Sequence, residues 1–207
     1  MRLIDTHSHL FLEEFSEDFP QVIERARAAG VTHIFMPNID STTIEAMLSA
    51  CSVYKGYCFP MIGLHPTSVN DNYEKELEIV ARELKFSKEY VAIGEIGMDL
   101  YWDKTYLKEQ QIVLDKQVNW ALEYDLPIVI HCRDAFDYIY KVLEPYKKTP
   151  LRGIFHSFTG TAEEAARVLE FSDFFIGING VVTFKKSHLP EILAGIPLEK
   201  IVLETDS

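Results

Sequence analysis

The chain has 207 residues, 47% hydrophobic and 25% charged, a composition that excludes an intrinsically disordered or fibrous protein. No apolar run reaches the roughly 18 residues of a membrane helix, and the N-terminal stretch lacks the unbroken apolar segment of a secretory signal. The formal net charge of −12 argues against a protein that clamps nucleic acid through a basic face, although cations bound in an acidic cleft can reverse the local field. We therefore expect a cytoplasmic protein with no membrane contact and no obligate protein partner.

Short apolar runs rich in Val, Ile and Phe alternate with longer segments of helical period along the whole chain. Strands are predicted at residues 3–6, 32–37, 58–64, 90–95, 127–131, 152–156, 174–178 and 200–205. Helices are predicted between them at residues 18–29, 42–54, 73–86, 104–124, 136–146, 162–171 and 189–194. Local signals agree with this pattern: Ser41 and Thr161 stand at expected N-cap positions, and Gly30 stands where the first helix ends.

Eight strands with intervening helices are typical of a TIM-like (β/α)8 barrel, and also of a doubly wound open sheet. The polar residues favour the barrel, because six of them stand at or just beyond the C-terminal ends of six strands, and these ends converge only when the sheet closes. The six are His9, His65, Glu95, His131, His156 and Asp206. No linker divides the chain, so residues 1–207 are predicted to form one domain. Because no helix follows the eighth strand, we expect a distorted barrel that lacks its C-terminal helix and is C-terminally incomplete.

The residue types at these positions suit metal binding. His7 and His9 are two residues apart on an extended segment, so both imidazoles project to the same side and can bind one ion. Glu95 follows an apolar strand, where a carboxylate either forms a salt bridge or bridges two cations. Imidazole and carboxylate donors without a thiolate suit Zn, Mn, Fe, Ni or Mg and argue against a closed structural zinc site. Six ligands divided between two ions would leave positions for water and substrate, as in hydrolytic sites whose ions lie about 3.5–4 Å apart.

Six short motifs resemble, in order, those of the TatD-type metal-dependent deoxyribonucleases, a family of amidohydrolase-like metallohydrolases. The motifs are at residues 5–9 (DTHSH), 63–66 (GLHP), 94–99 (GEIGMD), 131–135 (HCRDA), 156–160 (HSFTG) and 204–207 (ETDS). The resemblance implies a distorted TIM barrel that binds two divalent metal ions, Mg, Mn or Zn. The implied ligands of the first ion are His7, His9, Glu95 and Asp206. The implied ligands of the second ion are Glu95, His131 and His156.

The same resemblance implies catalytic roles. His65 would lie beside the metals and bind the phosphate or its leaving group, and Arg133 would be a further phosphate contact. Asp206 would orient or deprotonate a metal-activated water, and Glu95 would bridge the ions. The expected activity is hydrolysis of phosphodiester bonds in DNA, as a deoxyribonuclease that degrades single strands as an exonuclease.

Two other functions remain open at this point. An amidohydrolase-like enzyme could use the same residues to hydrolyse a small amide, lactone or phosphoester, and the net charge of −12 favours such a substrate over a polyanion. A binding module that has lost catalysis is disfavoured by the complete set of candidate ligands. Metal analysis and a nuclease assay would separate these alternatives.

Several residues near the motifs have two possible roles each. Asp99 is expected either to orient a metal ligand or to form a loop turn. Tyr101 and Trp102 follow it in a predicted loop, where they could stack on a nucleobase or form an apolar cover over the rim. The pair Lys185 and Lys186 could meet a phosphate backbone or be solvated in a loop.

Other residues are predicted to be structural or solvated. His33 falls near the start of a strand, away from the predicted mouth, and His188 lies in a polar loop. The three cysteines, Cys51, Cys58 and Cys132, form no paired pattern and are expected to be reduced, buried thiols.

Overall fold

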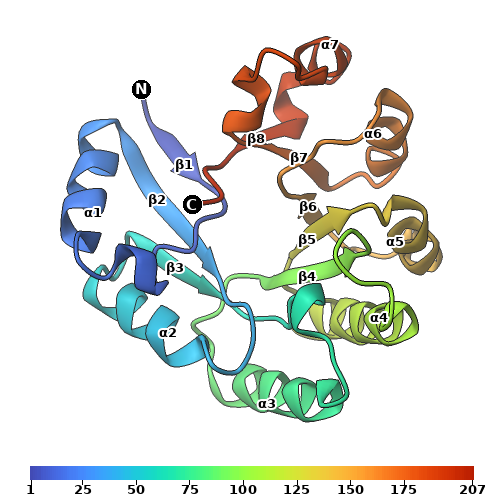
Figure 1. Cartoon of the computed structure of the whole chain (residues 1–207), viewed down its shortest axis with the longest axis horizontal. Coiled ribbons are helices and arrows are strands. Elements are labelled where there is room, and N and C mark those ends of the chain that lie inside the picture. The colour runs from blue at the N-terminus through green and yellow to red at the C-terminus, as the bar shows by residue number, and fades with distance from the viewer.

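The computed structural model describes residues 1–207 and contains the eight strands and seven helices that the alternating pattern predicts (Figure 1). The strands are β1 (Leu3–Asp5), β2 (Val31–Pro37), β3 (Cys58–Met61), β4 (Ile93–Asp99), β5 (Ile128–Arg133), β6 (Gly153–Phe155), β7 (Phe174–Ile178) and β8 (Ile201–Leu203). The helices are α1 (Phe19–Ala28), α2 (Ile44–Val53), α3 (Tyr73–Phe86), α4 (Leu107–Glu123), α5 (Phe136–Leu143), α6 (Ala162–Val168) and α7 (Leu189–Leu193). None of these helices is both long enough and apolar enough to cross a membrane.

All the strand pairs are parallel, and the strands form two arcs, β1-β2-β3 and β4-β5-β6-β7-β8. One seam between the arcs is a parallel bridge between Ile62 and Ile93. At the other seam, the N–H of Thr6 donates to the carbonyl of Leu203 at 3.1 Å. The helices surround the strands on the outside, as Figure 1 shows. The sheet is therefore a closed but distorted TIM-like barrel, because each seam has few ladder hydrogen bonds.

A buried carboxylate links β1 to the segment after β8, and we call this contact the Asp5–Thr205 link. Asp5 Oδ1 accepts hydrogen bonds from the N–H of Thr205 at 3.0 Å and from the N–H of His7 at 3.2 Å. Asp5 Oδ2 accepts from the Thr205 hydroxyl at 2.7 Å. The end of the chain consequently lies beside β1 (Figure 1). This link holds the first and last motifs of the sequence together.

One apolar cluster fills the space inside the sheet and between the sheet and its helices. It includes Ile34, Met36, Ile96, Phe155 and Phe174, none of which is more than 1% exposed. Burial of each such side chain contributes roughly 1.5–3 kcal/mol to folding. No helix covers the outer side of β8, and the exposed fraction of Leu203 is 54%.

The fourth strand differs from its prediction. The sequence predicted a strand at residues 90–95 that ends at Glu95, but β4 begins at Ile93 and continues to Asp99. Residues 93–99 are all buried and belong to the strand, so the glycine and polar residues among them do not mark the end of β4. At Gly97, whose φ is +140°, a Cβ atom would overlap the carbonyl oxygen of His131, so the absence of a side chain permits the close approach of β5. Glu95 is therefore the third residue of the strand, and its side chain lies deeper than a terminal residue would.

The helix signals are partly confirmed. Thr161 forms a capping box with Glu164 at the start of α6, and Gly30 follows α1 with a φ of +94°. Ser41 does not cap α2, which begins three residues later at Ile44. Its N–H and hydroxyl instead donate to the Glu76 carboxylate, both at 2.8 Å. Ser41 therefore forms a tertiary contact with α3 in place of the helix cap that the sequence pattern predicted.

Candidate metal centre

The C-terminal ends of the strands meet at one mouth of the barrel and bring the predicted polar residues together. Seven side chains gather there: His7, His9, His65, Glu95, His131, His156 and Asp206. Their potential ligand atoms form three groups, each with all atoms within 4.8 Å of one another. These groups are His7 with His9 and Glu95, His7 with His156 and Asp206, and His65 with Glu95 and His131.

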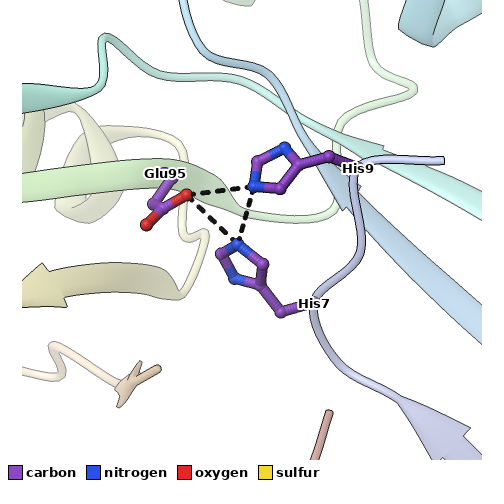
Figure 2. A group of neighbouring side chains, drawn as sticks. All are labelled: His7, His9 and Glu95. Carbon is purple, nitrogen blue, oxygen red and sulfur yellow. Dashed lines mark hydrogen bonds and ion pairs between the residues drawn. The ribbon is translucent and has the colours of Figure 1, made fainter. Parts of the chain in front are cut away.

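One oxygen of Glu95 faces the two histidines of the first motif. Oε2 lies 3.1 Å from His7 Nε2 and 3.3 Å from His9 Nε2 (Figure 2). The two imidazole nitrogens are themselves 3.1 Å apart. Atoms bound to one ion at about 2.0–2.2 Å are separated by about 3.0–3.6 Å, so the edges of this triangle have the length that a shared cation requires.

The other oxygen of Glu95 faces a second set of imidazoles. Oε1 lies 2.8 Å from His156 Nε2, 2.9 Å from His131 Nδ1 and 3.4 Å from His65 Nε2. The Glu95 side chain is only 3% exposed. A single buried carboxylate therefore stands between two groups of nitrogen donors, with one oxygen directed at each.

Asp206 lies at the rim of this cluster. Its Oδ1 is 3.8 Å from His7 Nε2, and its side chain is 34% exposed, far more than that of Glu95. The N–H of Asp206 donates to the carbonyl of His7 at 2.9 Å, which fixes the two residues relative to each other. The His7 ring also stacks on His156, with ring centroids 3.8 Å apart. Asp206 is thus held beside the histidines while its carboxylate reaches solvent.

Hydrogen bonds at the far nitrogens indicate which imidazole nitrogen is directed at the cluster. His131 Nε2 donates to Asp99 Oδ2 at 3.0 Å, so Nδ1, 2.9 Å from Glu95 Oε1, is the nitrogen that would bind a cation after losing its proton. His65 is the opposite case, because the N–H of Thr67 donates to His65 Nδ1 at 3.2 Å. The proton of neutral His65 is therefore on Nε2, which makes this atom a hydrogen-bond donor toward the centre.

Asp99 and Glu204 support the imidazoles from behind. Asp99 contacts both groups that the sequence considered for it: Oδ2 lies 3.0 Å from His131 Nε2, and Oδ1 accepts from the N–H of Tyr101 at 3.0 Å. Glu204 is buried, with Oε1 3.6 Å from His156 Nδ1 and in a hydrogen bond with the N–H of Ser157. Sequence reasoning assigned no separate role to Glu204; its only signal is a carboxylate within the last motif, two residues before Asp206.

The charges of the cluster balance internally. Burial opposes charge on Glu95, yet the neighbouring imidazoles, His156 foremost, hold the pKa of this carboxyl well below its usual value. Burial would lower the pKa of His156, but Glu95 and then Glu204 raise it well above the usual value. Burial lowers the pKa of His7, and the adjacent His156 adds to this effect. The neighbouring imidazoles therefore favour the charged form of Glu95, and a bound cation would favour it in the same way.

The donor set fits divalent cations. Buried Nδ1 atoms of His7, His9 and His156 have no hydrogen-bond partner, while the opposite nitrogens of the three rings converge on Glu95. Neither a lysine nor an arginine forms an ion pair with Glu95 or Asp206. Imidazole nitrogens with carboxylate oxygens are the donors that Zn, Mn and Fe accept, and Mg less readily. The donor atoms of the cluster are therefore of the types that bind divalent cations.

Three sequence-predicted positions lie outside this cluster. Arg133 is exposed at the end of β5, and its guanidinium carbon lies 3.8 Å from the centroid of the Tyr101 ring. His33 packs against Phe59 with ring centroids 5.5 Å apart, and His188 is exposed beside α7. His33 and His188 are thus separate from the mouth, in agreement with their structural interpretation.

Comparison with known proteins identifies relatives along nearly the whole chain. The family model for TatD related DNase matches residues 4–207. YabD of Bacillus subtilis (strain 168), named an uncharacterized metal-dependent hydrolase, is 37% identical over 205 residues, which are 99% of this chain and 79% of YabD. The 3′-5′ ssDNA/RNA exonuclease TatD of Pantoea sp. (strain At-9b) is 32% identical over 207 residues, which are 99% of this chain and 79% of that protein.

A solved structure gives the same result. The crystal structure of YjjV, a TatD homologue from Escherichia coli K12, matches with a TM-score of 0.91 and 31% sequence identity, over 99% of this chain and 79% of YjjV. The fold expected from the strand and helix pattern is therefore confirmed. The chain belongs to the TatD-related DNase family of metal-dependent hydrolases.

Proposed function

We propose that the protein is a divalent-metal-dependent exonuclease that hydrolyses phosphodiester bonds of single-stranded DNA from the 3′ end. The observation that carries this proposal is the position of Glu95, whose two oxygens face two separate groups of imidazoles. A bridging carboxylate between two ions is the arrangement that a two-metal hydrolase needs. The name of the Pantoea relative supports the choice of a single-stranded substrate.

Two divalent cations, Mg, Mn or Zn, would be shared by the clustered side chains. The proposed ligands of one are His7, His9, Glu95 and Asp206. The proposed ligands of the other are Glu95, His131 and His156. When bound, such ions supply a nucleophilic water at neutral pH and neutralise charge on the phosphoryl oxygens.

The side chains of the protein position the substrate and move the proton. Asp206, with its partly exposed carboxylate, orients the attacking water and accepts its proton. His65 donates from Nε2 to a phosphoryl oxygen or to the leaving oxygen, because Thr67 occupies Nδ1 and fixes this tautomer. Arg133 has no hydrogen-bonding or ion-pair partner for its guanidinium group within the protein, so it is available to a neighbouring phosphate.

A second candidate function has one observation in its favour. A cavity of about 320 Å³ adjoins His156 and is lined by the carboxylates of Asp134, Asp137 and Glu164. Asp137 is paired with Arg167 at 2.6 Å, but Asp134 and Glu164 have no cationic partner, so this side of the mouth would better suit a small uncharged amide, lactone or ester than a polyanion. In the exonuclease the substrate would lie on the Arg133 side of the mouth, and in the second candidate it would lie in the cavity beside His156.

The test is a nuclease assay on 5′-labelled single-stranded and duplex oligonucleotides, with Mg, Mn or Zn and with a chelator control. We expect a ladder of products shortened from the 3′ end of the single strand and no cleavage with chelator. His156→Gln should abolish cleavage, whereas the matched control His188→Gln, at an exposed histidine outside the mouth, should retain it. Hydrolysis of p-nitrophenyl esters without any cleavage of DNA would reject the exonuclease in favour of the second candidate.

A further inference from the structure

The loop after β4 exposes two aromatic rings at the mouth of the barrel. Tyr101 is 53% exposed and Trp102 is 72% exposed. Their ring centroids are 4.9 Å apart and their planes are nearly perpendicular, at 88°. Neither ring belongs to the apolar core. Such rings offer flat apolar surface on which a planar ligand can stack.

A single carboxylate fixes this loop relative to the metal centre. Asp99 Oδ1 accepts from the N–H of Tyr101 at 3.0 Å and from that of Trp102 at 3.5 Å. Asp99 Oδ2 lies 3.0 Å from His131 Nε2, on the ring whose other nitrogen faces Glu95. Trp102 is therefore positioned by the same residue that orients a proposed metal ligand.

Trp102 also lines a cavity of about 190 Å³. Pro66, the residue after His65, lines it too, as do the side-chain amide residues Asn70 and Gln110. Asn70 donates to the carbonyl of Ser68 and accepts from the N–H of Asn72. Gln110 accepts from the N–H of Asp99 and donates to its carbonyl. Both amides thus already hold a hydrogen bond at their oxygen and at their nitrogen within the protein, whereas the ring of Trp102 is free to stack on a planar ligand.

A guanidinium group lies beside the two aromatic rings. The guanidinium carbon of Arg133 lies 3.8 Å from the Tyr101 ring centroid and 5.2 Å from that of Trp102. Carboxylates line both cavities of the mouth, Asp99 and Asp103 beside Trp102 and Asp134, Asp137 and Glu164 near His156. Arg133 therefore supplies the positive charge beside the rings that can contact a phosphate of a bound strand.

We infer that Trp102, with Tyr101 and Arg133 beside it, forms a stacking platform for one nucleobase of the substrate strand and accepts the bases without strong preference. A base can reach this platform only when it is unpaired, so the platform selects single strands. The inference rests on the proposed function and defines its substrate subsite. Trp102 is a binding residue in this scheme and takes no part in the bond cleavage.

Steady-state kinetics of Trp102→Ala test the platform with two substrates. For single-stranded DNA we expect KM to rise by about 5- to 150-fold with kcat nearly unchanged, since a base stack contributes equally to the ground state and the transition state. The rise should be similar for oligo-dT and oligo-dA. For methyl p-nitrophenyl phosphate, a diester without a base, kcat/KM should stay within about twofold. Trp102→Phe, which keeps an aromatic face, should retain most of the affinity for DNA.

A fluorescence titration tests the platform independently of turnover. The sequence contains two tryptophans, so Trp120→Phe leaves Trp102 as the only one. A phosphorothioate oligonucleotide should quench this fluorescence saturably, and an oligomer of abasic sites should not. If the wild-type protein cleaves no DNA but the Trp102 fluorescence of the Trp120→Phe variant is quenched, the exonuclease proposal fails and base binding stands. Unchanged KM in Trp102→Ala, absent quenching, or an equal loss of kcat on both substrates, as expected of a cover over the mouth, would overturn the platform.

Discussion

The Asp5–Thr205 link is the place where the closure of the barrel can be tested by one substitution. Asp5→Ala removes the acceptor of three donors, the N–H of His7 and the N–H and hydroxyl of Thr205. Burial raises the pKa of Asp5 despite these hydrogen bonds. Part of the free energy that the hydrogen bonds contribute therefore offsets the cost of desolvating the carboxylate. At about 1 kcal/mol net for each lost bond, the free energy of unfolding should fall by about 3 kcal/mol.

Asp5→Asn is the matched control. The amide oxygen can still accept from both backbone N–H groups, and only the partner of the Thr205 hydroxyl changes. That hydroxyl has an alternative partner in the Ser207 hydroxyl, 2.8 Å away. The cost of this substitution should therefore be about 1 kcal/mol or less.

Urea denaturation followed by far-ultraviolet circular dichroism, with chelator present, measures both differences in the absence of metal binding. The expected order of stability is wild type, then Asp5→Asn close to it, then Asp5→Ala. The reasoning would be refuted by an alanine variant within about 1 kcal/mol of the wild type. It would be refuted equally by an asparagine variant as unstable as the alanine variant.

Three further predictions concern the centre and the thiols. Glu95→Gln should keep the circular dichroism spectrum but lower nuclease activity more than about 100-fold, because an amide nitrogen cannot replace a ligand oxygen; near-normal turnover would remove the bridging role. Mn or Zn at about 100 times its Kd should stabilise the protein by about 2.7 kcal/mol and raise Tm by about 5–10 °C in a thermal scan, whereas a His156→Gln variant should respond less. Burial raises the pKa values of Cys51 and Cys58 to about 12 each, which leaves little reactive thiolate at pH 8. In a Cys132→Ser variant, both thiols of the folded protein should react with a disulfide reagent more than about 100-fold slower than those of the denatured protein. Rapid reaction of the folded variant would show that the two thiols are accessible.

The regular elements could be predicted because their signals are local. The helix at Tyr73–Phe86 and the strand at Phe174–Ile178 have the bounds that periodicity predicted. β4 was misjudged because its polar and glycine residues are buried by neighbouring strands, and this packing is not visible in a window of sequence. Ser41 was misjudged for the same reason, since its partner Glu76 is 35 residues away.

The candidate site also has features that the sequence could predict and features that depend on the folded structure. Strand ends in a barrel meet at one mouth, so the gathering of His7 and Asp206 could be predicted from the pattern, whereas Glu95 joins them from within β4 and not from its end. The tautomer of His65 depends on a hydrogen bond from Thr67, and its proposed role as donor rather than ligand therefore requires the three-dimensional arrangement. The proposed ligand roles themselves remain predictions that metal binding must test.

The most direct test of the two-ion proposal is a crystal structure of the protein soaked with Mn, with anomalous scattering used to locate the ions. We predict two anomalous peaks about 3.5–4 Å apart, one on each side of the Glu95 carboxylate, with His9 at one peak and His131 at the other. A single peak, or two peaks that Glu95 does not bridge, would contradict the proposed mechanism.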